Sequence, residues 1–200
     1  MDDTTYARTC DLQAVAHVQA MSFIKSEARK GRKSIGFIPW SGIEKADKLG
    51  RVSVLLRNSD LVGFLVYGPG KTSAKVFQVW VREDARMLIH GRKMVEELAE
   101  WALHRGLFRI SLWCADDLPS NYFWRVLGFK NVARRKGGRH SGRMHTRYVQ
   151  SAIDLEASRR ARCCEPRAQL SQSNPLPLPP VSEAADQTAP RRQTVLCDPT

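Results

Sequence analysis

The sequence lacks a long apolar run and any cysteine pattern typical of a disulfide framework or a zinc site. No stretch reaches about 18 consecutive apolar residues, the length that a membrane-spanning helix requires. The five cysteines include no Cys-x-x-Cys pair. The first residues, MDDTTYARTC, are acidic at their start and contain no apolar stretch, unlike a secretory signal. We therefore expect a cytoplasmic protein that binds neither a membrane nor a metal.

Aromatic residues are absent after Tyr148, and seven of the ten prolines lie beyond residue 165. Such a segment buries too little apolar surface to offset the entropy of ordering its chain. The hydrophobic content of 42% is enough for one ordinary core. We predict a folded domain over residues 1–155 and a disordered, proline-rich tail over 156–200. A short helix within 151–164 could extend the domain.

Acidic residues are scarce in the predicted domain. The net charge of the chain is +12, and residues 1–150 carry all of this excess, because residues 151–200 hold six arginines and six acidic residues. A domain this basic attracts anions such as nucleotides, phosphorylated cofactors, nucleic acid or acidic surfaces. Charge alone does not choose among them.

Hydrophobic periodicity predicts alternating helices and strands. Helical spacing occurs over 12–30, 41–50, 90–105 and 119–128, and Ser41 is placed to cap the second of these helices. Runs typical of strands occur over 51–57, 61–69, 73–81, 107–114, 130–135 and 143–149. This order predicts an α/β (α+β) fold with a mixed sheet and helices on both faces.

The stretch REDARMLIHGRK, residues 82–93, leads into the third predicted helix. A helix start has unpaired N–H groups and partial positive charge, so it favours a phosphate. Gly91 would let a ligand approach the backbone, and Arg86, Arg92 and Lys93 add positive charge. A glycine beside basic residues is also common on ordinary surfaces. Neither a Gly-x-Gly-x-x-Gly nor a Walker loop is present.

A second motif, FWRVLGF, stands at residues 123–129. Together with the strand, loop and helix before it, this motif resembles the GCN5-related N-acetyltransferases. That family carries a Q/R-x-x-G-x-G/A loop at a helix start, where Arg86, Ile89 and Gly91 stand here. Ile89 departs from the pattern. The resemblance covers roughly residues 35–135 and implies a mostly antiparallel sheet of about six to seven strands.

The resemblance implies that the protein transfers an acyl group from acetyl-CoA, its co-substrate, directly to an amine. The central strand would bind the pantetheine arm, and the helix start would bind the pyrophosphate. The cofactor-binding residues implied are Val79, Trp80, Val81, Arg86, Ile89, His90, Gly91, Arg92 and Lys93.

Two positions of the usual mechanism carry other residues. Gln78 stands nearest to the place of the glutamate that often serves as base, and it cannot accept the proton. Trp124 replaces the tyrosine that often protonates the thiolate, and its indole N–H is not a useful acid. The candidate catalytic residues are Asp117, Asn121, Tyr122 and Trp124. These residues could instead cap a helix or pack, leaving catalysis to positioning and water.

The acceptor is not identified by any motif. Residues 25–33 and 134–147 are strongly basic, and Phe37, Trp40 or Tyr148 could offer a stacking face for a base. Three hypotheses remain open. One is N-acetylation of a small or protein amine. Another is modification of nucleic acid, either aminoacyl-tRNA acetylation or DNA base modification. The last is a degenerate, non-enzymatic binding module.

Overall fold

A computed structural model describes residues 4–31, 38–86, 88–137 and 143–164. Residues Met1–Glu165 form one compact unit. The strands are β1 (Thr4–Arg8), β2 (Val52–Arg57), β3 (Asp60–Pro69), β4 (Ala74–Val81), β5 (Arg109–Ala115), β6 (Lys130–Lys136) and β7 (Met144–Ser151). The helices are α1 (Ala14–Gly31), α2 (Trp40–Lys48), α3 (Leu88–Leu103), α4 (Ser120–Val126) and α5 (Ala152–Cys164), with short 3₁₀ turns η1 (Thr9–Asp11) and η2 (Glu83–Ala85). Within the described ranges, no helix is long and apolar enough to cross a bilayer.

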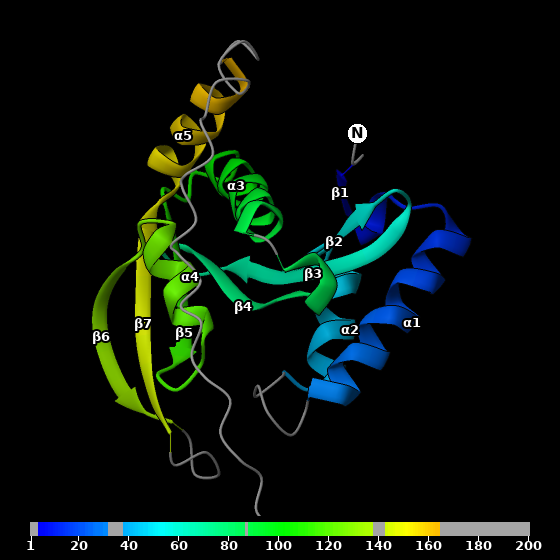
Figure 1. Ribbon diagram of the computed structural model, residues 1–200, viewed down its shortest axis with the longest axis horizontal. Helices are drawn as coiled ribbons and strands as arrows, with labels where there is room; N and C mark the ends of the chain where they lie inside the picture. The colour runs from blue at the N-terminus through cyan, green and yellow to red at the C-terminus, as the bar shows by residue number, and fades with distance from the viewer. Residues whose placement is uncertain (1–3, 32–37, 87, 138–142, 165–200) are drawn as a thin grey trace, which may run out of the picture. The chain divides into compact units, whose positions relative to one another are not determined.

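The strands form one sheet of seven, in the order β1-β2-β3-β4-β5-β7-β6 (Figure 1). Every neighbouring pair is antiparallel except β4 and β5, which are parallel and are connected through α3. A parallel pair needs such a crossover because its strands start at the same end of the sheet. The predicted mixed, mostly antiparallel sheet with helices on both faces is confirmed.

Two hydrophobic clusters hold the helices against the sheet. On one face, α1 and α2 contribute Ile24 and Ile43, which are fully buried with Phe64 of β3. On the other face, α3, α4 and α5 pack over β4, β5 and β7, and their buried side chains include Met94, Leu98, Trp124 and Leu155. The apolar stripe of α3 follows the helical period, so one side of this helix is sealed against the sheet.

Turn residues fix several connections. Asn58 and Ser59 between β2 and β3 both have positive φ, 50° and 69°, as a tight hairpin of type I′ geometry requires. Gly128 follows α4 with φ of 81° and ends that helix in the left-handed conformation that glycine tolerates best. These turn and stop positions agree with the sequence predictions.

Three local predictions need correction. No strand was expected at Thr4–Arg8, but β1 pairs antiparallel with β2 at the sheet edge. Ser41 does not cap α2, because that helix begins at Trp40 with Pro39 before it. Helix α3 begins at Leu88 rather than residue 90, which places Gly91 in its first turn. A short edge strand and a helix boundary both depend on neighbours that a local pattern does not contain.

Candidate active site

Strands β4 and β5 separate in the middle of the sheet. Their pairing covers only Ala74–Val76 opposite Ile110–Leu112, although β4 continues to Val81 and β5 to Ala115. A bulge in β4 precedes the separation: Val66 lies opposite Gln78 and Tyr67 opposite Val76, so Phe77 is the extra residue. Because a bulge bends its strand and increases the twist, it accounts for the divergence of β4. A gap therefore opens between the two strands beyond Val76.

The peptide groups of two β4 residues point into this gap. The N–H of Arg82 donates to the carbonyl of Val62 on β3 at 2.7 Å. Peptide groups alternate along a strand, so those of Trp80 also face β3, whereas those of Val79 and Val81 face the opposite side. The geometry therefore supports Val79 and Val81 as backbone ligands.

The position of Trp80 does not fit the backbone role that was predicted for it. Its peptide group is directed to β3, opposite Phe64. Its indole packs near Phe23 and Phe64, at ring-centroid distances of 5.7 and 5.8 Å, on the α1 and α2 face of the sheet. The backbone role predicted for Trp80 is therefore not supported by its place in the strand.

The connection from β4 to α3 places Arg86 beside the gap. The Nε of Arg86 donates to the carbonyl oxygen of Val81 at 3.0 Å, on the side of β4 that lacks a partner strand. Arg82 and Asp84 form an ion pair at 2.6 Å across η2, and this pair lowers the pKa of the Asp84 carboxyl. These contacts order the loop so that a guanidinium lies close to the start of α3, where unpaired N–H groups attract anions.

Gly91 has a packing role that the sequence did not indicate. A Cβ at this position would lie 2.9 Å from two ring atoms of Phe123 in α4, a distance that real side chains do not adopt. The glycine therefore lets α3 pack closely against α4. Gly91 is buried, and its missing side chain is explained by Phe123.

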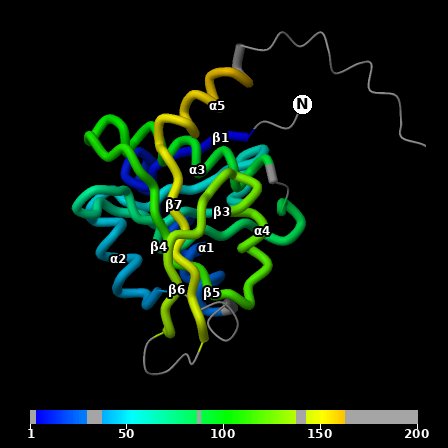
Figure 2. The backbone as a smooth tube through the Cα atoms, turned by 90° about the vertical axis from the view of Figure 1, so that its left-hand side faces the viewer, coloured from blue at the N-terminus to red at the C-terminus, as the bar shows by residue number. Residues whose placement is uncertain are grey.

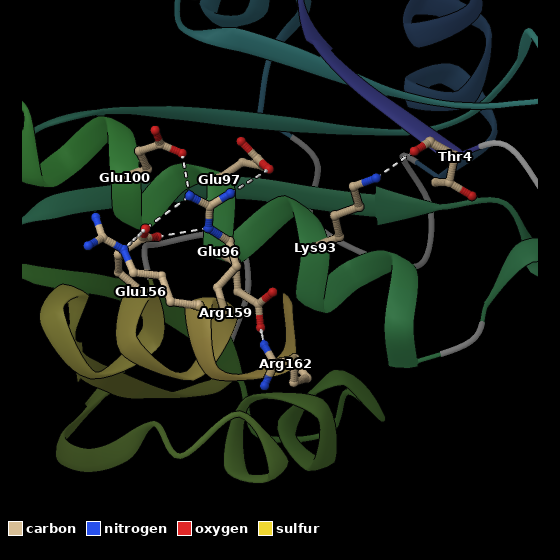
Figure 3. A network of polar contacts seen from close by, with 9 residues as sticks. Thr4, Lys93, Glu96, Glu97, Glu100, Glu156, Arg159 and Arg162 are labelled. Carbon is tan, nitrogen blue, oxygen red and sulfur yellow. Dashed lines mark hydrogen bonds and ion pairs between the residues drawn. The ribbon is translucent and has the colours of Figure 1, made fainter. Parts of the chain in front are cut away.

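Its neighbours in the first turns of α3 point in different directions. His90 is 5% exposed, so any contact with a cofactor would come through its backbone. Ile89 is 64% exposed at the surface of the first turn. Lys93 donates a hydrogen bond from Nζ to the carbonyl of Thr4 in β1, which engages the ammonium group away from the helix start (Figure 3). Arg92 is half-buried and forms no ion pair within the described part of the chain.

The candidate catalytic residues around α4 fall into two groups. Trp124 is 2% exposed and packs against Phe123 and Phe129, with ring centroids 4.8 and 5.1 Å away. The amide of Asn121 donates to three backbone carbonyls and accepts a hydrogen bond from the Tyr148 hydroxyl at 3.0 Å. Both residues therefore stabilise the structure between β5 and α4.

Asp117 and Tyr122 remain near the surface. Tyr122 is 62% exposed, and Asp117 lies 3.4 Å from Arg143 in an exposed ion pair. Either side chain is accessible to an incoming molecule, unlike Trp124. Their catalytic roles stay predictions.

Sequence reasoning missed two polar contacts in this region. Gln78 is buried, and its side-chain oxygen accepts a hydrogen bond from the Ile38 N–H at 3.4 Å. The thiol of Cys114 lies 3.3 Å from the Ser120 hydroxyl, and burial raises the pKa of this thiol. Burial also raises the pKa of the Tyr148 hydroxyl. No local pattern signals these contacts, because each joins separate elements.

Comparison with known proteins identifies a family. The family described as "Acetyltransferase (GNAT) family" matches residues 12–129. No curated protein matches the sequence. The matched residues run from the end of η1 to just after α4, so they include β4, the gap and the start of α3.

Solved structures share the fold. Ard1 from Thermoplasma volcanium is 15% identical with a TM-score of 0.60, covering 74% of this chain and 97% of its own. The ribosomal-protein-S18-alanine N-acetyltransferase from Escherichia coli is 17% identical with a TM-score of 0.52, covering 75% and 94%.

A protein described as a streptothricin acetyltransferase from Bacillus anthracis, solved with acetyl coenzyme A, is 17% identical with a TM-score of 0.47. That match covers 50% of this chain and 61% of the other, less than two thirds of its length. The two matches with TM-scores above 0.5 establish the fold and, at identities under 25%, no finer property.

Proposed function

The chain belongs to the acetyltransferase (GNAT) family, and on this premise we propose that it transfers an acetyl group from acetyl-CoA to an amine. The observation that carries the proposal is the gap between β4 and β5, which leaves the peptide groups of Val79 and Val81 facing an open edge beside the first turn of α3. An extended amide-bearing chain can add to such an edge as another strand does. We expect this reaction to take place in the cytoplasm.

The residues of the gap fit the two chemical parts of acetyl-CoA. Val79 and Val81 would hold the pantetheine arm through their backbone. The N–H groups of Ile89, His90 and Gly91, at the start of α3, would hold the pyrophosphate. Arg86 and Arg92 would add positive charge there, with Arg86 exchanging its bond to the Val81 carbonyl for a phosphate oxygen. Two other predicted cofactor-binding residues already have other contacts. The Lys93 ammonium donates to the Thr4 carbonyl, and the Trp80 peptide group faces β3.

Bound acetyl-CoA supplies an activated thioester, and the amine attacks its carbonyl carbon directly. The protein must then hold both reactants in register, stabilise negative charge on the carbonyl oxygen and remove a proton from the ammonium. A backbone N–H of β4 directed into the gap is suited to the second task. Asp117 and Tyr122 are the accessible polar side chains of the predicted set, and water can carry the proton if neither does.

Ile89 offers the sharpest test of cofactor binding. A side chain introduced at Gly91 would clash with Phe123, so a loss of affinity could reflect disturbed packing rather than lost cofactor contacts. Ile89→Glu instead places a carboxylate at an exposed position of the first helical turn, where it should stabilise the helix by about 0.3–1 kcal/mol. The same carboxylate should repel a pyrophosphate, since two charges about 4 Å apart interact by roughly 1–4 kcal/mol near a protein surface.

We therefore expect Ile89→Glu to weaken acetyl-CoA binding at least tenfold, roughly 1.4 kcal/mol, in isothermal titration while its melting temperature stays equal or rises. Ile89→Gln has nearly the same size without the charge and should bind within about threefold of the natural chain, roughly 0.7 kcal/mol. Equal affinity in both variants would place the pyrophosphate elsewhere. Intact binding without acetylation of any amine would favour the non-enzymatic module.

A further inference from the structure

The strands beyond the gap expose one face of the sheet. The register puts Trp113 of β5 opposite Arg147 of β7, and Arg147 opposite Ala133 of β6. Residues two apart on a strand share a face, so this face carries the polar and aromatic side chains of Arg109, Trp113, Lys130, Arg135, His145 and Arg147, together with Ser111, Ala115, Ala133, Val149 and Ser151, of which Ser111 and Ala115 are buried. We call this set the open face.

The opposite face of the same strands is covered. Its residues include Ile110, Leu112 and Tyr148, which are buried in the core with α3, α4 and α5. Helices α1 and α2 lie on the same side of the sheet as the open face, but they pack over β2 and β3 at its other end. In Figure 2, β6 and β7 run in front of the rest of the chain without a helix drawn across them.

Cationic side chains on the two faces differ in whether a carboxylate pairs with them. On the covered face, Arg134 donates from Nε to Asp116 at 3.0 Å, and Thr146 donates to the same carboxylate at 2.7 Å. On the open face, Arg109, Lys130, Arg135 and Arg147 form no ion pair with any carboxylate of the described residues. Four cations thus share one surface without a counter-charge, which costs mutual repulsion and favours an anionic partner.

An aromatic ring lies among these cations. Trp113 is 37% exposed, and the guanidinium of Arg135 lies 4.0 Å from the centre of its ring. Arg147 stands directly opposite Trp113 across the strand pair. Of the aromatic residues predicted to stack, Tyr148 is buried, Phe37 lies outside the described residues, and Trp40 is half-buried with the Lys25 ammonium 5.2 Å from its ring centre. Trp113 is a further exposed ring, which the sequence did not single out.

We propose that the open face binds a single strand of nucleic acid, whose phosphates contact the cations and one of whose bases stacks on the Trp113–Arg135 pair. Alternating cations around an exposed aromatic ring suit an unpaired base with a charged backbone. An anionic membrane would require several apolar side chains to insert, whereas Trp113 is the one exposed large apolar residue of this set. The proposal does not depend on acetyl transfer.

Part of the open face lies beside the gap. Trp113 follows Leu112, the last β5 residue paired with β4, so Trp113 lies where the gap opens, whereas Arg109 lies at the other end of the paired segment. A strand bound there would pass the edge of the proposed active site. The basic segment 134–147 contributes Arg135 and Arg147, while its residues 138–142, like residues 32–37, lie outside the described part of the chain.

Binding of a fluorescent oligouridine to the full chain, followed by anisotropy at two salt concentrations, tests the proposal. Arg135→Gln/Arg147→Gln should weaken binding about tenfold and reduce the salt slope by at most about 1.4, because each phosphate contact on a single strand contributes about 0.7. Lys45→Gln/Lys48→Gln removes the same charge from the exposed surface of α2 and should change affinity by no more than about twofold. Equal loss in both double variants would overturn the proposal.

Substitutions at Trp113 distinguish binding of a nucleic-acid strand from binding of other polyanions. Trp113→Ala should weaken oligouridine binding about tenfold through lost stacking, and Trp113→Phe should retain most of it. Neither variant should alter binding of heparin, which has charge but no bases. Identical heparin and oligouridine responses to Trp113→Ala, or tighter binding to anionic phosphatidylserine vesicles than to oligouridine, would each refute the single-strand assignment. Acetyl-CoA titration of these variants should be unchanged.

Discussion

The two ends of α3 carry opposite charges, and the protein neutralises only one of them. The first turns hold Arg92, which has no acidic partner in the described chain, whereas Arg86 in the preceding loop lies 3.7 Å from Glu83. The later turns hold Glu96, Glu97 and Glu100, which meet arginines of α5 (Figure 3). The contrast shows that one helix can serve two purposes. Its C-terminal half pairs with α5, and its N-terminal end is the place where we propose that an anion binds.

The α5 contacts form a connected network. Arg159 lies 2.9 Å from both Glu100 and Glu156 and 3.6 Å from Glu97, and Arg162 pairs with Glu96. Hydrogen bonds from Arg159 lower the pKa of the Glu156 carboxyl, and Arg160 adds to the effect. Burial has the opposite effect on Glu97 and raises its pKa. The buried Glu96 is accompanied by Arg162 of α5, and the buried Glu156 is accompanied by Arg159 and Arg160 of its own helix, so neither buried carboxylate lacks a counter-charge.

Among changes to the contacts between α3 and α5, removal of the Arg159 side chain should lower the free energy of unfolding most. Arg159→Ala leaves Glu97, Glu100 and Glu156 without their shared partner, and we expect a loss of about 2 kcal/mol, below the range for fully buried pairs because the site is partly exposed. The measurement is urea unfolding at pH 7. Arg160→Ala is the matched control, since Arg160 is exposed and contacts Glu156 alone; it should cost less than about 0.5 kcal/mol. Equal losses would show that the network is not cooperative.

The pH dependence of the same contacts should be smaller and has a defined sign. Because the pKa of Glu156 is lowered in the folded state, its contribution is present above the ordinary carboxyl pKa of about 4.3 and disappears as pH falls through the folded value. Glu156→Gln should therefore cost about 1.5 kcal/mol at pH 7, and this cost should shrink as pH falls below the ordinary carboxyl pKa.

Glu97→Gln provides the opposite control for this titration. The raised pKa of Glu97 means that the folded state takes up its proton first, so the natural chain gains stability relative to Glu97→Gln as pH falls. Urea unfolding of both variants across pH 3–7 measures the two slopes. Parallel slopes for the two variants would contradict the assigned directions.

Removal of the chain after residue 165 should have the smallest effect. Helix α5, with its buried Leu155 and its arginines, remains in such a truncated protein. The removed segment has no aromatic residue and is rich in proline, so we predict a change below about 0.5 kcal/mol in the free energy of unfolding. A clear drop in melting temperature would show that neutralisation of α3 requires more of the chain than α5.

Much of the fold could be predicted because its signals are local. The stripe of Met94, Leu98 and Ala102 identifies α3, and the NSD turn identifies the β2–β3 hairpin. The edge strand β1 was missed because its sequence, TTYAR, alternates weakly and gains its order from pairing with β2. Residues of the site were harder to assign than the elements that carry them.

Gly91 and Lys93 illustrate the difference. Both stand in a motif that suggests phosphate binding, yet Gly91 faces Phe123 and Lys93 bonds to Thr4, which is 89 residues away in the chain. Arg134 and Arg135 are adjacent in sequence, but only Arg134 meets a carboxylate. Side chains that alternate across a strand enter different surroundings, and the sequence does not state what those surroundings contain.

The sequence alone determined the alternation of elements, the helix start after the central strand and the basic character of the domain. Hydrophobic periodicity, turn residues and charge can each be read from a short stretch of sequence. The tertiary structure decided which peptide groups of β4 stay unpaired, what fills the space beside Gly91 and which cations lack a counter-charge. Those outcomes depend on β5, α4, α5 and β1 arriving from distant positions, and contact between distant segments is a property of the folded chain.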